Sequence, residues 1–555
     1  MSISLSLIQT CFIAGNIDAN LERITLLYRM ATIAKADLVV FPEMAVSGYA
    51  AQDLLLAPAF RQRVAAAVAR CAALTVGGPA MLLGAPVADG DRLYNAALLL
   101  ADGQVLARRD KHHLPNDGVF DEQRYFTAGP LPLPIAWRGL QLGVMVCEDM
   151  WRADVAAHLR QHGAELLVVL NASPFEAGKQ ARREALAACR VQETGLPLMY
   201  VNQVGAQDEL VFDGGSFVLA ADATLAARLV SFGDDMEPLR LLGDGPARVP
   251  QAGTVRAPLT QVEQRYHAMT VGLRDFVQRN GYAGVLLGMS GGIDSALAAA
   301  LAADALGPAQ VRCLMLPSPV TSADSIEDAA DCAARLGIAY SAVPISDGMN
   351  AFAAMLETAT GAAPTPLAMG ENQTRLRAGI LLALSRQHNL LLLNTGNKSE
   401  LAVGFTTPYG DLCGHYAVLK DLYKTEVYEA ARWRNGHGEV IPPRILSKAP
   451  SAELYPGQTD QDTLPPYAEL DAMLRQLIEH GQDVDAVAAL GFARPLVQQV
   501  RDWLYGAEYK RHQAPPGVKL GPMSFRHDRR YPITNGWHVM EQQRAQPLPQ
   551  PGAAA

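Results

Sequence analysis

Apolar segments of six or seven residues alternate with Ala-rich amphipathic segments from the start of the chain to about residue 235. Segments of this length predict β-strands separated by helices. Leu21, Ile24, Tyr28 and Ala31 have the spacing of one helix face and mark the first of these helices. The predicted strands are residues 3–9, 36–41, 81–87, 95–100, 104–110, 140–146, 165–170 and 196–201.

The alternation stops near Pro238, where a Gly- and Pro-rich segment without periodicity begins. Such a segment predicts a linker between two domains. We expect one domain over residues 1–245, the linker over 246–261, a second domain over 262–540, and a disordered Pro- and Gln-rich tail over 541–555.

After the linker, apolar strands again alternate with helices, one of them very rich in Ala. This alternation predicts an α/β fold with a doubly wound parallel sheet that helices cover on both faces. The predicted elements are a helix at about 261–279, a strand at 284–288, a helix at 295–307, and strands at 311–317, 339–345 and 389–395.

The composition indicates a large globular protein, because 555 residues with 49 % hydrophobic side chains can fill more than one core. The net charge of −9 argues against nucleic-acid binding, which needs clustered Lys and Arg. The first basic residue is Arg23, and no apolar stretch of about 20 residues occurs, so we expect neither a signal peptide nor a membrane span. We expect a cytoplasmic protein without nucleic-acid or membrane partners.

The cysteines are scattered and never spaced as CxxC, so neither a disulfide framework nor a zinc site is indicated. A reducing compartment fits this pattern best. The seven positions are Cys11, Cys71, Cys147, Cys189, Cys313, Cys332 and Cys413.

Three reactive side chains, Glu43, Lys111 and Cys147, each follow a predicted strand. Active sites of α/β proteins gather at such strand ends. Glu43 could take the thiol proton, the Cys147 thiolate could attack an amide carbon, and Lys111 could stabilise the oxyanion. Composition alone favours a plainer interpretation, in which the cysteine is a small core residue and the two charged residues are solvated.

The segments around these residues favour catalysis. "FPEMAVSGY", "DKHHLPNDGVFDEQRYF", "VMVCEDMW" and "NASPFEAGKQARR" resemble, in order and spacing, the nitrilase-like glutaminase domain over nearly the whole first half. The resemblance implies a four-layer αββα sandwich with Glu43, Lys111 and Cys147 as the catalytic triad. It also implies that Ser173 and Lys179 hold the glutamine substrate.

Asp117 departs from that family, whose members usually read "LPNYGVF" where this chain reads "LPNDGVF". A glutamine-contacting Tyr is therefore replaced by Asp117. We keep Asp117 as a glutamine-binding position, because a backbone contact would survive the change.

The segment "GVLLGMSGGIDSALAAAL" combines a strand, a Gly-rich turn and a helix start, where free backbone N–H groups and the helix dipole bind anions. Gly-rich turns often only reverse the chain, but this order resembles the PP-loop of ATP-dependent adenylating ligases. The loop lacks a Walker lysine because such enzymes break the bond at the α-phosphate and must hold pyrophosphate. The expected ATP-binding loop is Gly288, Met289, Ser290, Gly291, Gly292, Ile293, Asp294 and Ser295, with Asp294 also a Mg²⁺ ligand.

Downstream, "NTGNKSELAVGFTTPYGD", "VLKDLYKTEVY", "KAPSAELYPGQTDQDTLPPY" and "YKRHQAPPGVKLGPMSFRHDRRYPI" resemble the NAD⁺ synthetase domain. The resemblance implies that Thr395 contacts ATP, that Glu400 lies by metal and substrate, and that Lys510 binds deamido-NAD⁺. Without it, Glu400 would be an ordinary helix-start carboxylate and Lys510 an ordinary surface cation.

Two further positions differ from the relatives. In "GENQTRLRAG" one residue fewer separates Asn372 from Arg375, so either a residue is deleted or the Asn has moved; we keep Asn372 as a deamido-NAD⁺-binding residue. Met289 replaces a frequent Leu, which is an apolar exchange of similar volume.

Together the two halves resemble the glutamine-dependent NAD⁺ synthetase family. The resemblance implies amidation of deamido-NAD⁺ through an adenylate, with ATP and Mg²⁺, ammonia released from L-glutamine at Cys147, and a homo-oligomer. Three alternatives stay open: an ammonia-dependent NAD⁺ synthetase, another PP-loop amidotransferase with altered amidase specificity, and a non-catalytic nucleotide sensor.

Overall fold

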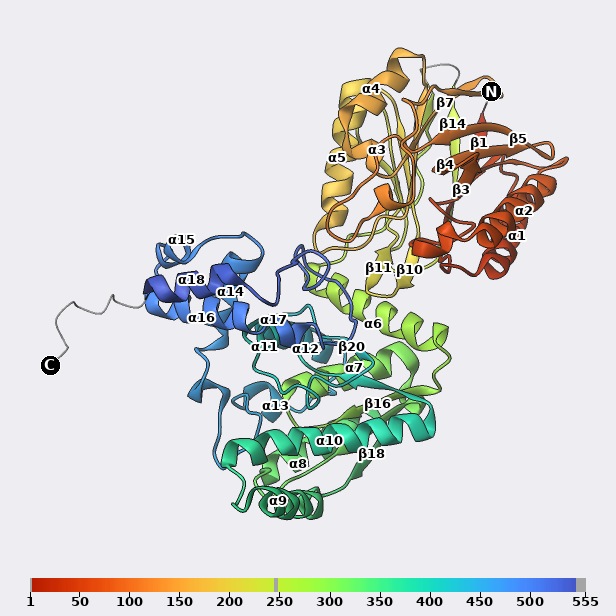
Figure 1. Cartoon of the computed structure of the whole chain (residues 1–555). Helices are drawn as coiled ribbons and strands as arrows, with labels where there is room; N and C mark the ends of the chain where they lie inside the picture. The colour runs from red at the N-terminus through yellow and green to blue at the C-terminus, as the bar shows by residue number, and fades with distance from the viewer. Residues whose placement is uncertain (1, 244–247, 546–555) are drawn as a thin grey trace. The chain divides into compact units, whose positions relative to one another are not determined.

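The computed structural model describes residues 2–243 and 248–545. The chain divides into two compact units, residues 1–275 and 276–555. In Figure 1 the first unit runs from red to yellow-green and the second from green to blue. Each unit has its own sheets and its own buried core.

Two mixed sheets form the first unit, and parallel strands lie at the centre of each. The seven-stranded sheet has the order β15 (Val249–Pro250), β14 (Asp235–Leu242), β1 (Ile3–Gln9), β2 (Leu38–Val40), β3 (Ala80–Asp89), β4 (Arg92–Ala101) and β5 (Gln104–Asp110). The six-stranded sheet has the order β13 (Leu225–Arg228), β12 (Phe217–Leu219), β9 (Leu198–Asn202), β8 (Leu166–Asn171), β7 (Leu140–Val146) and β6 (Ile135–Trp137). A separate hairpin pairs β10 (Val204–Gln207) with β11 (Leu210–Asp213).

Apolar side chains from both sheets meet in one core, which includes Leu5 and Leu82 from the first sheet and Val168 from the second. On the outer face of the first sheet lie α1 (Ile17–Ile33) and α2 (Pro58–Leu74). The outer face of the second sheet is covered by α3 (Glu148–Trp151), α4 (Ala153–Gln161) and α5 (Lys179–Thr194). The order helix, sheet, sheet, helix confirms the predicted αββα sandwich (Figure 1).

All eight strands predicted in the first half are present, but the prediction of irregular structure from Pro238 onward is wrong. Residues 235–242 form β14, which pairs antiparallel with β1 and buries Leu239 and Leu241. The alternation of buried and exposed residues in β14 covers only a few positions and is interrupted by Pro238. The Gly and Pro residues of this segment therefore give the stronger sequence signal, which favours a loop. Of the predicted linker over 246–261, residues 246 and 247 lie outside the described residues, and Val249 and Pro250 form β15.

The second unit contains a five-stranded sheet in which every pairing is parallel. The strand order 3-2-1-4-5 by sequence confirms the doubly wound topology. Leu381 and Leu384 of α10 pack on one face of the sheet against Leu286, Leu390 and Leu392. The strands in sheet order are β18 (Ala339–Ala342), β17 (Val311–Met315), β16 (Gly284–Gly288), β19 (Leu390–Asn394) and β20 (Tyr416–Ala417).

Helices surround this sheet, and a second apolar cluster forms among the helices beyond residue 400. The helix predicted near 261–279 is α6 (Gln261–Arg279), which begins in the first unit and ends in the second. The others are α7 (Ile293–Leu306), α8 (Ala323–Leu336), α9 (Ser346–Thr360), α10 (Pro366–His388), α11 (Lys398–Val403), α12 (Lys424–Asn435), α13 (Pro443–Ser447), α14 (Tyr467–Ile478), α15 (Val484–Ala488), α16 (Arg494–Gly506), α17 (Glu508–Arg511) and α18 (Gly536–Ala545).

The helix α18 extends into the predicted tail, whose residues 546–555 lie outside the described residues. Among the helices that the structure describes, none offers an apolar stretch long enough to span a bilayer.

Gly84 on β3 is required by a close backbone approach, because a Cβ there would lie 2.5 Å from the Met44 nitrogen and 2.6 Å from the Glu43 Cα. We expect Gly84→Ala to destabilise the first unit by about 1 to 3 kcal/mol, as overpacking does, and to lower its thermal midpoint in circular dichroism.

Gly233→Ala is the matched control, because its added Cβ would come no closer than 3.4 Å to a neighbouring atom, which is an ordinary contact. An unchanged midpoint in Gly84→Ala would show that the Glu43 segment does not depend on this contact.

Candidate active sites

Glu43, Lys111 and Cys147 come together in the first unit, where β2, β5 and β7 end. The Lys111 Nζ lies 2.9 Å from Glu43 Oε1, and all three residues are buried. Glu43 and Lys111 come from the first sheet and Cys147 from the second. The cluster is therefore built across the sandwich from the carboxyl ends of three strands.

The Glu43 carboxylate is held by two further donors. Asn95 Nδ2 donates to Oε1 at 2.7 Å, and the backbone N–H of Ala172 donates to Oε2 at 2.8 Å. Each oxygen therefore has a fixed direction, which leaves the carboxylate little freedom to rotate.

Cys147 has an unusual backbone conformation, with φ 46° and ψ −92°, directly before α3. A positive φ is costly for a residue with a side chain and is found most often at functional positions. The backbone N–H of Cys147 donates to the Leu170 carbonyl at 3.0 Å, which ties the turn to β8. Burial and Glu43 raise the pKa of the Cys147 thiol well above its ordinary value, while Lys111 acts in the opposite direction. The resting thiol is therefore protonated and needs a base.

A second carboxylate, Glu122, belongs to this cluster and was missed by the sequence analysis. Lys111 Nζ donates to Glu122 Oε1 at 2.8 Å, and the Tyr49 hydroxyl donates to the same oxygen at 3.0 Å. Burial raises the pKa of Glu122 to about 7, although Lys111 acts against this. Burial would lower the pKa of Lys111, but Glu122 and Glu43 outweigh it and raise that pKa well above its ordinary value. The sequence did contain one signal for Glu122, because this residue lies in the segment "DEQRYF", which belongs to the same family-like stretch as Lys111.

Ser173 and Lys179 lie after β8 and at the start of α5, beside a buried ion pair. Ser173 accepts from Arg183 Nε at 3.2 Å, and Arg183 Nη1 is 2.8 Å from both oxygens of Asp213. Burial, and secondly Arg183, lower the pKa of Lys179 to about 8. Its Nζ lies 5.8 Å from the centre of the Phe120 ring.

Asp117 lies apart from the buried cluster, since it is exposed in the loop that also carries Phe120. The Asp117 carbonyl accepts a turn hydrogen bond from the Phe120 N–H at 2.9 Å. Burial raises the pKa of Glu148. The positive charges of Lys111 and Arg152 act against this rise, and the negative charge of Asp117 adds to it. The structure thus places the Asp117 charge near the residue that follows Cys147.

In the second unit the predicted phosphate loop connects β16 to α7. Gly291 has φ +77°, and a Cβ there would lie 2.2 Å from the Ser325 carbonyl oxygen, so only glycine fits. Ser290 and Ser295 stabilise the turn, with their hydroxyl oxygens 3.1 Å apart and the Ser290 N–H donating to Ser295 Oγ at 3.2 Å.

This loop forms one wall of a cavity of about 300 Å³. Every residue of the predicted loop lines the cavity, as do Thr395 and Glu400. Other charged residues along its walls are Arg377, Asp411, Lys424, Lys448, Glu453 and Asp460.

Lys424 supplies the amino group that the loop itself lacks. Its Nζ lies 2.6 Å from Asp294 Oδ2 and 3.2 Å from Glu400 Oε1, and Asn397 Nδ2 donates to Asp294 Oδ1 at 2.9 Å. Burial opposes a charged Lys424, yet Asp294 and Glu400 raise its pKa. The sequence analysis missed it because Lys424 follows Asp294 by 130 residues.

Glu400 is held by a capping box with Asn397 at the start of α11. Burial raises the pKa of Glu400 to about 7, with Asp294 and Asp460 adding to the shift and Lys424 opposing it. Asp460 contributes a third carboxylate, and in the described structure its buried Oδ1 has no hydrogen-bond partner.

Asn372 and Lys510 are not among the residues that line this cavity. Asn372 is buried in α10, and its Nδ2 has no partner within the described structure. Lys510 Nζ donates to the carbonyls of Gly404 and Thr406, each at 2.7 Å. The structure therefore brings the loop, Thr395 and Glu400 together but leaves these two residues outside.

Family models match both units. The carbon-nitrogen hydrolase model matches residues 4–236, and the NAD synthase model matches residues 265–514. Two similar curated proteins are glutamine-dependent NAD(+) synthetases. The one from Rhodobacter capsulatus is 48 % identical over 94 % of this chain and 96 % of its own. The one from Acinetobacter baylyi is 40 % identical over 97 % and 99 %.

Solved structures agree. A glutamine-dependent NAD⁺ synthetase from Acinetobacter baumannii, in complex with ADP, is 38 % identical, has a TM-score of 0.78, and aligns over 97 % of this chain and 99 % of its own. One from Cytophaga hutchinsonii shares the fold at 20 % identity, with a TM-score of 0.84 over 98 % and 100 % of the two chains. The chain therefore belongs to the glutamine-dependent NAD⁺ synthetase family, with a carbon-nitrogen hydrolase domain followed by an NAD synthase domain.

Proposed function

We propose that the protein amidates deamido-NAD⁺ to NAD⁺ at the expense of ATP, with ammonia taken from L-glutamine. One observation carries the proposal: a single chain joins a buried Cys, Lys and Glu set to a glycine loop that faces a lysine and two carboxylates. The first set suits amide hydrolysis and the second suits polyphosphate binding.

The glutaminase reaction begins at Cys147. Glu43 removes the thiol proton, and the thiolate attacks the amide carbon of glutamine. Lys111, held at 2.9 Å from Glu43 and 2.8 Å from Glu122, stabilises the oxyanion that forms. Glu43 then returns the proton to the departing ammonia, and a water activated by Glu43 hydrolyses the thioester. Ser173 and Lys179 would hold the substrate, and the exposed Asp117 would contribute through its backbone.

The synthetase reaction needs activation, because a carboxylate is a poor electrophile. The nicotinate carboxylate of deamido-NAD⁺ attacks the α-phosphorus of ATP, and pyrophosphate leaves. Backbone N–H groups of the loop and the start of α7 hold the departing anion, and Lys424 neutralises part of its charge. Ammonia then attacks the adenylate and AMP departs. Thr395 lines the same cavity and would contact ATP.

Mg²⁺ fits the carboxylates of this cavity, since it prefers hard oxygen ligands. Asp294 and Glu400 would hold it, and the unpartnered Oδ1 of Asp460 offers a third oxygen among the described residues. When bound, Mg²⁺ would offset phosphate charge.

Deamido-NAD⁺ would reach beyond the cavity wall toward Lys510 and Asn372. Lys510 would have to release its two carbonyl partners to meet it. The free Nδ2 of Asn372 is a buried donor for which substrate could supply an acceptor.

We further propose a homo-oligomer in a reducing, cytoplasmic compartment. All seven cysteines are free thiols, which supports the compartment.

Product analysis tests the reaction. With ATP, Mg²⁺, deamido-NAD⁺ and glutamine, we expect NAD⁺, AMP and pyrophosphate in equal amounts, measured by chromatography. ADP formation, or no NAD⁺ with either nitrogen donor, would overturn the assignment. NAD⁺ formed from ammonium but not from glutamine would favour an ammonia-dependent synthetase with altered amidase specificity.

Replacing the nucleophile separates the two reactions. We expect Cys147→Ala to lower glutamine-dependent NAD⁺ synthesis about 10³-fold or more, while synthesis from added ammonium continues. Cys189→Ala is the control, because Cys189 is an exposed thiol of the same unit. If Cys147→Ala used glutamine normally, Cys147 would not be the nucleophile.

Lys424 is expected to act in the adenylation step, which NAD⁺ synthesis requires with either nitrogen donor. Lys424→Met removes the charge facing the phosphates and should lower kcat about 10²-fold or more with glutamine and with ammonium alike. Arg434→Met on the same helix, whose side chain pairs with Asp304 instead, should leave kcat unchanged. Normal ammonium-dependent turnover in a folded Lys424→Met protein would refute this role.

A further inference from the structure

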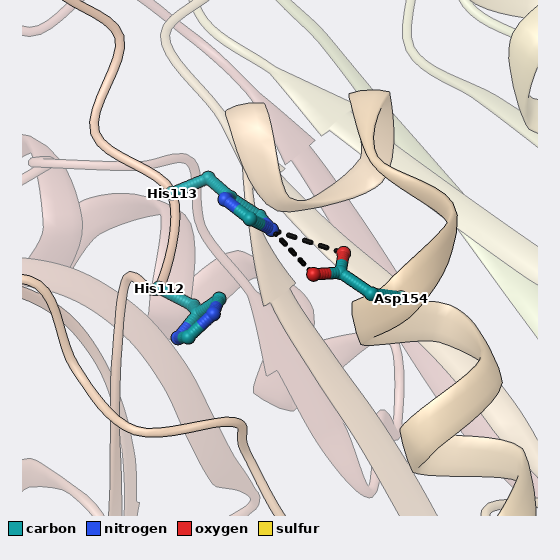
Figure 2. Close-up of side chains that lie close together, drawn as sticks. All are labelled: His112, His113 and Asp154. Carbon is teal, nitrogen blue, oxygen red and sulfur yellow. Dashed lines mark hydrogen bonds and ion pairs between the residues drawn. The ribbon is translucent and has the colours of Figure 1, made fainter.

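A cluster of two histidines and an aspartate lies in the first unit outside the groups used above. His112 and His113 follow Lys111 in the loop after β5, and Asp154 lies in the first turn of α4 (Figure 2). One ligand atom from each of the three residues lies within 4.8 Å of the other two. Imidazole nitrogen and carboxylate oxygen are both ligands of divalent transition metals.

The spacing of His113 and Asp154 already suits two ligands of one ion. His113 Nε2 lies 2.9 and 3.0 Å from the two oxygens of Asp154. Bonds of about 2.0 to 2.2 Å to a zinc-class ion place neighbouring ligand atoms roughly 2.9 to 3.4 Å apart. An ion could therefore replace the proton between these groups with movements of a few tenths of an ångström.

His112 is oriented as metal-binding histidines commonly are. Its Nδ1 lies 2.7 Å from the Gly129 carbonyl oxygen. A carbonyl can only accept, so Nδ1 carries the hydrogen and Nε2 keeps its lone pair in the neutral ring. A hydrogen bond from the second ring nitrogen to a backbone carbonyl is the usual outer-shell support of such a ligand.

The two histidines are also fixed through their backbone. The N–H groups of His112 and His113 donate to Asp149 Oδ1 at 3.0 and 2.8 Å, and Asp149 Oδ2 accepts from the Val146 N–H at 3.0 Å. Asp149 is buried, and its carboxylate thereby ties the histidine loop to the end of β7. Because these bonds hold the loop before any ion arrives, binding would cost little ordering.

A plain ion pair between His113 and Asp154 accounts for those two residues but gives no role to the second ring nitrogen of His112, whose ring lies 4.6 Å from that of His113 at 78°. Two neutral imidazoles and one carboxylate suit a transition metal ion such as Zn²⁺, which accepts nitrogen ligands. Mg²⁺ and Ca²⁺ need mostly oxygen ligands.

We propose that His112, His113 and Asp154 form a binding site for a divalent transition metal of the zinc class, with water completing the coordination. The cysteine spacing indicated no zinc site, but this one uses no cysteine. Its ligands come from two segments 41 residues apart, which no short motif reveals.

Cobalt tests the site because its visible absorption reports its ligands. The full-length Cys147→Ala protein, freed of metal with a chelator, is dialysed into excess Mg²⁺, which occupies the carboxylates of the second unit, and is then titrated with Co²⁺. The catalytic thiol is thus removed as a competing ligand. We expect one Co²⁺ per chain, ligand-field bands without the ultraviolet band of a cobalt thiolate, and displacement by Zn²⁺.

His113→Ala and Asp154→Asn, each in the Cys147→Ala background, should weaken Co²⁺ binding about tenfold or more, since each removes a direct ligand. Asp154→Asn keeps the side-chain shape at a half-exposed position, so weaker Co²⁺ binding in this variant would not be caused by misfolding. His388→Ala, at an exposed histidine of the second unit, should bind Co²⁺ unchanged.

Three results would overturn the proposal: no saturable binding, unchanged affinity in His113→Ala and Asp154→Asn, or a thiolate band from another cysteine as the only signal.

Discussion

Each of the two candidate active sites holds a buried lysine between two carboxylates, and the surrounding structure is arranged to keep that charge paired. Lys111 lies between Glu43 and Glu122, and Lys424 lies between Asp294 and Glu400. Removing one partner of a buried pair typically costs about 3 to 5 kcal/mol, because a charge is left without compensation. Each lysine therefore links the segments that carry its two carboxylate partners.

The fold supplies these partners from separate strands. Glu43 follows β2, Lys111 follows β5 and Cys147 follows β7, so the αββα sandwich must close before the first set exists. In the second unit Asp294 belongs to α7 and Lys424 to α12, so two helices that are distant in the sequence must meet to form the second set. Glycines allow the close approaches that this requires, at Gly84 below the Glu43 segment and at Gly291 against Ser325.

The sequence predicted those elements whose signal lies in consecutive residues. Strands with continuous apolar runs, the Ala-rich α7 and the phosphate loop could all be read from neighbouring residues. β14 could not, because its alternation is brief and interrupted by Pro238. Lys424 could not either, because its partner Asp294 lies 130 residues away along the chain. Glu122 lies only 11 residues from Lys111, but nothing in the local sequence shows that both side chains are buried together. Thr395 and Glu400 were placed by family motifs, and both line the cavity, whereas Asn372 and Lys510 do not.

The charge balance of the two sets explains why they differ in their need for a cation. With all groups ionised, Lys111 with Glu43 and Glu122 leaves one surplus negative charge, and Lys424 with Asp294, Glu400 and Asp460 leaves two. In the first unit a proton can remove it, since burial brings the pKa of Glu122 to about 7, and glutamine arrives with no net charge. In the second unit burial and Asp294 likewise bring the pKa of Glu400 to about 7, but the incoming ligand is a polyphosphate. A single proton cannot balance several phosphate charges beside three carboxylates, so this site requires added positive charge when its substrate binds.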